Sequence, residues 1–232
     1  MIKLCISGSK GKMGSSIIRL AKDDPDLEVA GQFDIGEDAE APISGCDCLI
    51  EFTSPEATIE HLVICEKEKK AMVIGTTGLN DGQRARIKEA SRSIPVVFSP
   101  NMSIGVNVLF KLIEDAARLL GPEYGISILE AHHVNKKDAP SGTAKELARI
   151  IESKKTAVKV PIESVREDEI VGEHTITFES PVVVIELTHS AKTRDIFAEG
   201  ALEAARFAVK AKAGLYTMKD VQAFKRGMYG QI

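Results

Sequence analysis

The hydrophobic and polar positions of the first hundred residues follow two periods in turn, a strand period and a helical one. Ile2, Leu4 and Ile6 alternate with Lys3, Cys5 and Ser7, which predicts a short buried strand, and apolar residues then recur at helical spacing over residues 15–22. The same analysis predicts strands at 27–33, 48–53, 71–74 and 95–99, with helices at 55–69 and 81–93. This alternation is typical of a parallel sheet with helices on both faces, on which the loops after the strands face a ligand.

The pattern changes from residue 104 onward. A helix is expected at 104–120, a strand at 126–131 and a helix at 144–152, followed by β-rich sequence over 158–188. Within that segment, residues 173–178 and 182–187 have the pattern of long paired strands, and a final helix is expected at 195–213. The fold class predicted is therefore α/β, with an N-terminal Rossmann-like nucleotide domain and an α+β second domain.

Three glycines follow the first strand as G-x-x-G-x-x-G, at Gly8, Gly11 and Gly14. Glycine is needed where a tight turn brings a pyrophosphate against the backbone at a helix N-terminus. The second strand ends at Asp34, twenty residues past Gly14, where a carboxylate can accept hydrogen bonds from ribose hydroxyls. The alternative is an ordinary strand-to-helix turn. We expect a dinucleotide site built from Gly8, Lys10, Gly11, Lys12, Met13, Gly14, Asp34, Gly75, Thr76, Thr77, Ser99, Pro100, Asn101 and Met102.

Two lysines inside the glycine loop leave the choice of cofactor open. Lys10 and Lys12 are either solvated charges or ligands of a 2′-phosphate. Asp34 opposes them because its carboxylate repels that phosphate, and it is followed by Ile35 where an arginine often marks NADP preference. Since the opposing Coulomb effects are similar in size, we expect both NADH and NADPH to be used, with NADH preferred by less than about a hundredfold.

Residues that can transfer protons or bind anions are most concentrated at positions 130–143, E-A-H-H-V-N-K-K-D-A-P-S-G-T. His132 and His133 can exchange protons near neutral pH, and Lys136 supplies a positive charge or a proton. The Ser-Gly-Thr turn opens a helix, whose first backbone N–H groups favour an anion. The segment indicates a small anionic substrate that must be protonated; the alternative is a polar surface loop capped by Ser141 or Thr143.

Composition excludes several other classes of function. The 232 residues have a net charge of −4 with both signs interspersed, which is not the footprint of a nucleic-acid or anionic-membrane protein. No apolar run approaches a membrane span and no signal peptide is expected. The spacing of Cys5, Cys46, Cys48 and Cys65 predicts buried free thiols in a reducing cytoplasm, and no ligand cluster indicates a metal.

Taken together, the chain resembles the 4-hydroxy-tetrahydrodipicolinate reductase family, formerly dihydrodipicolinate reductase, almost from end to end. The motifs that carry the resemblance are G-x-x-G-K-M-G (8–14), V-I-G-T-T-G (73–78), N-M-S-I-G-V-N (101–107), E-A-H-H with K-x-D-A-P-S-G-T (130–143), I-V-G-E-H-T (170–175) and G-L-Y-x-M-x-D-V (214–221). The chain departs from the family in a shorter stretch between Asp34 and the strand at residue 48, and in having Ile35 where some members have a basic residue.

The resemblance implies roles for individual residues. His132 would be the proton donor and acceptor and Lys136 the proton donor, while His133, Gly142 and Thr143 would hold the carboxylates of a small dicarboxylate substrate. Arg194 and Phe197 resemble residues near the nicotinamide end. It also implies NADH or NADPH as cofactor, a cytoplasmic homotetramer and a role in lysine and diaminopimelate biosynthesis. The nucleotide domain would comprise residues 1–103 and 194–232, and the substrate-binding and oligomerisation domain residues 104–193.

Two rival classes of protein share the nucleotide half. One is another small Rossmann-fold NAD(P)-dependent dehydrogenase; the acylating type is disfavoured because the second half has no plausible catalytic cysteine or serine. The other is a non-catalytic nucleotide sensor, for which the sequence has no basic patch or DNA-binding helix pair, and which would have no need of His132 and Lys136.

Overall fold

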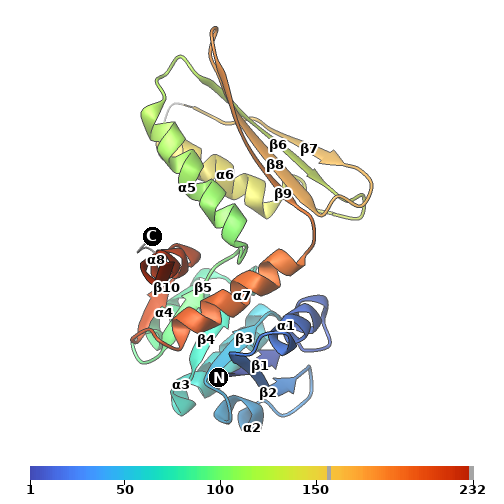
Figure 1. The fold of residues 1–232 in the computed structure, drawn as a ribbon, viewed down its shortest axis with the longest axis vertical. Helices are drawn as coiled ribbons and strands as arrows, with labels where there is room; N and C mark the ends of the chain where they lie inside the picture. The colour runs from blue at the N-terminus through green and yellow to red at the C-terminus, as the bar shows by residue number, and fades with distance from the viewer. Residues whose placement is uncertain (156–157, 230–232) are drawn as a thin grey trace. The chain divides into compact units, whose positions relative to one another are not determined.

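The computed structural model describes residues 1–155 and 158–229. Its contacts divide the chain into two compact units. The first unit comprises Met1–Ile104 and Asp195–Ile232, and the second comprises Gly105–Arg194. The chain therefore leaves the first unit once and returns to it for its last helices (Figure 1).

A parallel sheet forms the centre of the first unit. Its order is β10-β5-β4-β3-β1-β2, and every neighbouring pair is parallel. The strands are β1 (Ile2–Ser7), β2 (Leu27–Phe33), β3 (Cys48–Glu51), β4 (Ala71–Ile74), β5 (Pro95–Phe98) and β10 (Gly214–Tyr216). Because β1 has β2 on one side and β3 on the other, the strand order reverses there, and ligands bind at the carboxyl ends of strands at such a point.

Helices cover both faces of this sheet, as the alternating pattern predicted (Figure 1). One apolar core packs β-strand residues such as Leu4 and Ile6 against α1 (Lys12–Lys22), α7 (Asp195–Ala208) and α8 (Met218–Tyr229). The other packs Cys5 and Leu49, which point to the opposite face, against α2 (Glu40–Ser44), α3 (Pro55–Glu68) and α4 (Asp81–Ala90). All four cysteines are buried free thiols, as expected.

The second unit is a mixed sheet with two helices on one face (Figure 1). The sheet order is β7-β6-β8-β9, with β6 parallel to β7 and antiparallel to β8. Its elements are α5 (Ile104–Leu119), β6 (Gly125–His132), α6 (Gly142–Glu152), β7 (Ile162–Arg166), β8 (Gly172–Glu179) and β9 (Val184–Ala191). The expected long strand pair is confirmed as antiparallel β8 and β9.

The C-terminal segment differs from the sequence-based prediction. The expected helix at 195–213 ends at Ala208, where turn bonds from Lys210 N to Phe207 O and from Ala211 N to Ala208 O replace the helical pattern. Gly214 N then donates to Ile94 O and β10 joins the sheet beside β5, followed by α8, which was not predicted. The Lys- and Ala-rich residues 209–213 therefore form turns despite their helix propensity and lead into the strand that pairs with the sheet edge.

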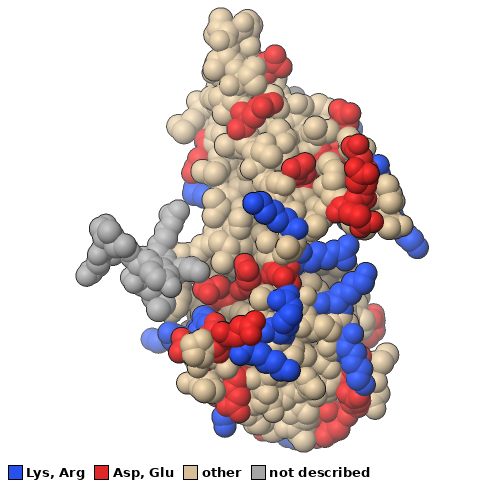
Figure 2. All heavy atoms as spheres, turned by 45° about the vertical axis from the view of Figure 1, so that its right-hand side comes forward, with Lys and Arg blue, Asp and Glu red and all other residues tan. Residues whose placement is uncertain are grey.

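The surface carries charges of both signs. Lys and Arg side chains are interspersed with Asp and Glu on the face drawn in Figure 2. Among the described residues, no helix is both long and apolar enough to cross a membrane.

Candidate active site and cofactor pocket

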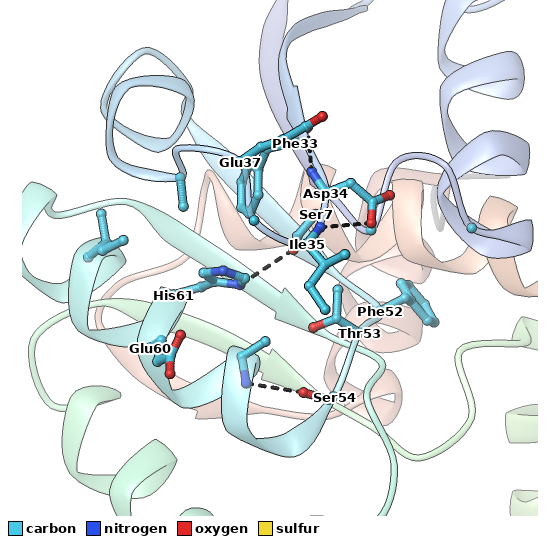
Figure 3. Close-up of a pocket in the computed structure, with 16 residues that line it drawn as sticks. Ser7, Phe33, Asp34, Ile35, Glu37, Phe52, Thr53, Ser54, Glu60 and His61 are labelled. Carbon is cyan, nitrogen blue, oxygen red and sulfur yellow. Dashed lines mark hydrogen bonds between the residues drawn. The ribbon is translucent and has the colours of Figure 1, made fainter.

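A cavity of about 690 Å³ opens at the carboxyl ends of β1, β2 and β3 in the first unit. This volume lies in the range of small-molecule and cofactor sites. The loop after β1, the turn after β2, the segment after β3 and the helix α3 all contribute to it (Figure 3). The lining residues are Ser7, Gly8, Gly11, Phe33, Asp34, Ile35, Gly36, Glu37, Ala39, Phe52, Thr53, Ser54, Ala57, Glu60, His61 and Ile64.

The glycine loop has the geometry of a phosphate cradle. Gly8 has a φ of 71°, and its backbone N–H donates to Phe33 O over 3.1 Å, which ties the loop to the end of β2. A Cβ on Gly14 would lie 2.2 Å from Gly8 O, so only glycine permits this close approach. Gly11 caps α1 without a side-chain hydrogen bond, and a helix start of this kind suits an anion. These residues therefore fit the pyrophosphate of a dinucleotide.

Asp34 is held in place by two backbone donors. Its Oδ2 accepts from Lys10 N and its Oδ1 from Ile35 N, each over 2.8 Å. The hydrogen bond from Ile35 N, followed by that from Lys10 N, lowers the pKa of this carboxyl. An ionised carboxylate has further lone pairs, so Asp34 can still accept from ribose hydroxyls.

One of the two lysines of the glycine loop already has an acidic partner. Lys10 Nζ lies 2.6 Å from Oε1 of Glu37, a residue that the sequence analysis did not single out. Glu37 also accepts through Oε2 from Asp34 N over 2.8 Å. To predict this ion pair from the sequence, one would have to know the turn at residues 34–37, where Glu37 N donates to Asp34 O.

Two expected cofactor segments lie at strand ends but do not line this cavity. Thr76, in the segment Gly75 to Thr77 after β4, is buried, and its hydroxyl oxygen accepts from Thr58 Oγ1 over 2.9 Å and from Thr53 N over 3.3 Å. In the segment Ser99 to Met102 after β5, Ser99 Oγ donates to Asn101 O over 2.8 Å. Their contact with a cofactor stays a prediction.

An apolar wall and a histidine complete the cavity, and the sequence analysis missed them. One side of α3 contributes Ala57, His61 and Ile64 to the cavity. Their helical spacing is visible in the sequence and could have indicated that they share a face. The Nδ1 of His61 lies 2.6 Å from Oε2 of the fully buried Glu51, and its ring packs edge-on to Phe33 with centroids 4.9 Å apart.

The second candidate site lies on the buried face of β6 in the second unit. Strand alternation puts Ile126, Ile128, Glu130 and His132 on the same side, toward the helices. The first two belong to the apolar core, whereas Glu130 and His132 continue that face as buried polar groups. The pairings Glu130↔His174 with β8 and His132↔Arg166 with β7 bring two more ionisable side chains alongside.

Glu130 is the centre of this polar cluster. Its Oε2 accepts a short hydrogen bond from Nδ1 of His132, while its Oε1 accepts from Arg166 Nη2 over 2.8 Å and from Ser141 N over 3.3 Å. Burial acts to raise the pKa of Glu130, but the hydrogen bonds from Arg166 and Ser164 and the nearby positive charges outweigh it and lower the pKa to about 2. Glu130 is therefore an anion at neutral pH, as buried carboxylates with such donors are.

His132 is held as a neutral ring with one nitrogen directed away from Glu130. Burial lowers the pKa of His132, Glu130 counteracts this, and the charges of Lys136 and Arg166 lower the pKa further. With Nδ1 donating to Glu130, Nε2 is the nitrogen left for proton transfer. A Cβ on Gly172 would lie 3.0 Å from that Nε2, so the small residue on β8 leaves room for the ring.

His174 supports the cluster from the neighbouring strand. Its ring meets the His132 ring edge-on with centroids 5.2 Å apart, and its Nε2 lies 3.2 Å from Oγ of Ser141. Burial, followed by the charge that His132 carries when it is protonated, lowers the pKa of His174 to about 4. Ser141 is the N-cap of α6 and accepts from Ala144 N over 3.1 Å. The cluster thus holds the start of α6 against β6 and β8.

The remaining expected site residues lie around this cluster. Lys136 Nζ pairs with Asp138 Oδ1 at 2.7 Å, and Nη2 of Arg194 lies 3.0 Å from Nε2 of His133. Gly142, the first residue of α6, is exposed, and a Cβ built on it meets nothing within 4 Å. Thr143 follows it, half-buried. Binding of an anion at the start of α6 stays a prediction.

Three of these side chains also have the spacing of a metal site. The ligand atoms of Glu130, His132 and His174 lie within 4.8 Å of one another. However, Arg166 already neutralises Glu130 through a 2.8 Å ion pair, and a divalent ion would add charge beside that guanidinium. We therefore assign the three residues to a hydrogen-bond cluster, and the absence of a functional metal stays a prediction.

These two sites and the doubly wound sheet define a Rossmann-type nicotinamide-dependent oxidoreductase with a separate α+β unit. Solved structures of that class share the fold. A probable dehydrogenase from Thermotoga maritima has a TM-score of 0.65 at 13% identity and covers 96% of this chain and 93% of its own. A dihydrodipicolinate reductase from Paenisporosarcina sp. TG-14, bound to dipicolinate, has a TM-score of 0.83 at 23% identity and covers 94% of this chain and 97% of its own.

The sequence comparisons identify the family. A model described as the N-terminus of dihydrodipicolinate reductase matches residues 2–102, and one described as its C-terminus matches residues 105–222. Proteins named 4-hydroxy-tetrahydrodipicolinate reductase are similar along their length: that of Citrifermentans bemidjiense is 35% identical over 263 residues and that of Rubrobacter xylanophilus 39% over 259, each covering 95% of this chain and 98% of the relative. The chain belongs to the dihydrodipicolinate reductase family.

Membership confirms the expected class of function. The chain is an NAD(P)H-dependent oxidoreductase of lysine and diaminopimelate biosynthesis, and its first unit is a nucleotide-binding domain. Nothing in the comparisons favours the rival dehydrogenase or the non-catalytic sensor.

Proposed function

We propose that this chain reduces 4-hydroxy-tetrahydrodipicolinate to tetrahydrodipicolinate with the proton chemistry of the Glu130–His132 cluster and Lys136. Overall, the substrate loses its hydroxyl group as water and gains one hydride and one proton. A bound NADH or NADPH supplies the hydride. The observation that carries the proposal is the buried carboxylate that holds His132 with Nε2 directed away from it.

The chain's own residues supply the proton steps and the binding of charge. His132 transfers a proton through Nε2, and Lys136 donates one from its ammonium group. The substrate's carboxylates bind at the open start of α6, to the backbone of Gly142 and the hydroxyl of Thr143, with His133 beside them. Arg194, which contacts His133, adds a cation on the same side.

The cofactor binds in the cavity of the first unit. The glycine loop with Met13 holds the pyrophosphate, Asp34 holds the ribose, and Lys10 and Lys12 lie within reach of a 2′-phosphate. The segments Gly75 to Thr77 and Ser99 to Met102 contact the nicotinamide half. Both NADH and NADPH are used, with NADH preferred, because Asp34 is followed by Ile35, an apolar residue that is 97% exposed at this position.

The protein acts as a cytoplasmic homotetramer assembled through the sheet of the second unit. The sheet face opposite the helices exposes apolar side chains, among them Leu129 at 43% and Val184 at 52%. The proposal follows the assembly that the family resemblance implies, and these side chains lie on the face that it would cover. Light scattering coupled to gel filtration tests this: the mass expected is four times 25.1 kDa, and a monomer would contradict it.

The decisive test of function is an absorbance assay at 340 nm with 4-hydroxy-tetrahydrodipicolinate generated in the cuvette by a synthase. We expect oxidation of NADH, and more weakly of NADPH, that depends on the synthase. The control replaces the substrate by an amino acid or a 2-oxo acid. Oxidation with those compounds, and none with the generated substrate, would contradict the proposal.

A further inference from the structure

A tight turn after β2 places a second carboxylate beside Asp34. Gly36 has a φ of 78°, a value that glycine adopts readily, and Glu37 N donates to Asp34 O over 3.0 Å. The turn folds the Glu37 side chain back, so that its Oε2 accepts from Asp34 N over 2.8 Å. Figure 3 labels both residues among those lining the cavity.

The same carboxylate holds the lysine of the glycine loop. Glu37 Oε1 lies 2.6 Å from Lys10 Nζ, while the backbone N–H of Lys10 donates to Asp34. The hydrogen bond with Glu37 raises the pKa of Lys10, and the same bond lowers the pKa of Glu37, so both groups are charged at neutral pH. Two carboxylates and one ammonium leave this end of the cavity with a net charge of −1.

We propose that Glu37 determines cofactor specificity in this chain by holding Lys10 and adding negative charge beside Asp34, so that NADH is favoured over NADPH. The inference rests on the proposed dinucleotide site. A free ribose diol brings no charge to this end of the cavity, whereas a 2′-phosphate brings nearly two negative charges. Lys10 alone would attract that phosphate, but its charge is already compensated by Glu37.

Equilibrium binding tests the role of Glu37 without relying on turnover. NADH and NADPH are titrated separately by calorimetry into the wild type and into Glu37→Gln. The substitution removes one charge that repels the 2′-phosphate and releases Lys10 from its ion pair. At contact distance in water, each change should alter the affinity for NADPH by about fivefold. We expect affinity for NADPH to rise roughly tenfold, less at high salt, with little change for NADH.

Two further variants separate the proposed role from simpler explanations. Glu40→Gln is the matched control, because Glu40 pairs with Lys67 on the surface nearby and does not line the cavity; it should leave both affinities unchanged. In the double variant Lys10→Met/Glu37→Gln, the increase in affinity for NADPH should be clearly smaller than in Glu37→Gln alone. An equal shift for both cofactors in Glu37→Gln, or an equal gain with and without Lys10, would overturn the inference. Failure of the wild type to bind either dinucleotide would instead contradict the proposed function itself, and the inference with it.

Discussion

Glu130 and His132 lie two residues apart on the buried face of β6, and the carboxylate of one accepts a hydrogen bond from Nδ1 of the other. Arg166 balances the carboxylate from β7, and Ser141 joins it to the start of α6. A single strand therefore supplies both the histidine that we propose to transfer a proton and the carboxylate that sets its tautomer.

Glu130→Gln should lower kcat by about tenfold to a hundredfold and leave cofactor affinity unchanged, because a carboxylate that orients a metal-bound histidine has an effect of this size and Glu130 orients His132 in the same way. Since Glu130 raises the pKa of His132, the limb of the pH–rate profile due to His132 should also move to lower pH. Glu163→Gln, an exposed glutamate on β7 paired with Leu129, is the control. A lower kcat with an unmoved pH limb would mean that Glu130 is only structural.

Arg166→Met should destabilise the fold by about 3–5 kcal/mol, since it leaves the fully buried Glu130 without its counter-charge. Denaturant unfolding measures this. In the double variant with Glu130→Gln the loss should be smaller than the sum of the two single losses, because each variant removes the same ion pair. Strict additivity would show that the pair does not couple the strands.

The low pKa of His174 should make the free energy of unfolding depend on pH. Its pKa of about 4 in the folded chain is below the ordinary value of 6.5, so the unfolded chain binds the proton first and stability falls as pH falls from 6.5 to 4. The contribution is up to about 3 kcal/mol. In His174→Gln this part of the loss should disappear, as measured by urea unfolding across that pH range. Parallel curves for the two proteins would contradict the assignment.

Gly172→Ala should lower kcat without weakening cofactor binding, because its Cβ would lie 3.0 Å from Nε2 of His132 and displace the ring. Gly125→Ala on β6 is the matched control, since the nearest atom, Glu179 O, would be at an ordinary 3.7 Å from the new Cβ. We expect a loss of roughly tenfold in kcat for the first variant, in line with the sensitivity of proton transfer to geometry. Equal activity in both would show that the ring has room to move.

The sequence predicted elements with a clear local period and missed contacts that depend on the register of the sheets. The strands at 27–33 and 71–74 were predicted correctly because their apolar residues lie between turn signals. The three-residue β10 has no such pattern and forms only because β5 offers a sheet edge. Likewise, His132 was found from residue type, whereas Arg166 became visible only once β7 paired with β6. Glu37 required the turn after β2.

We propose that His132, held by Glu130, transfers a proton during reduction of the dicarboxylate substrate. The most direct measurement compares the 340 nm rate of His132→Gln with that of the wild type at saturating substrate and NADH, alongside the NADH dissociation constant of each. We predict that kcat falls by roughly 10²–10⁴-fold while the dissociation constant changes by less than about twofold. A variant that turns over at a near-normal rate would contradict the account.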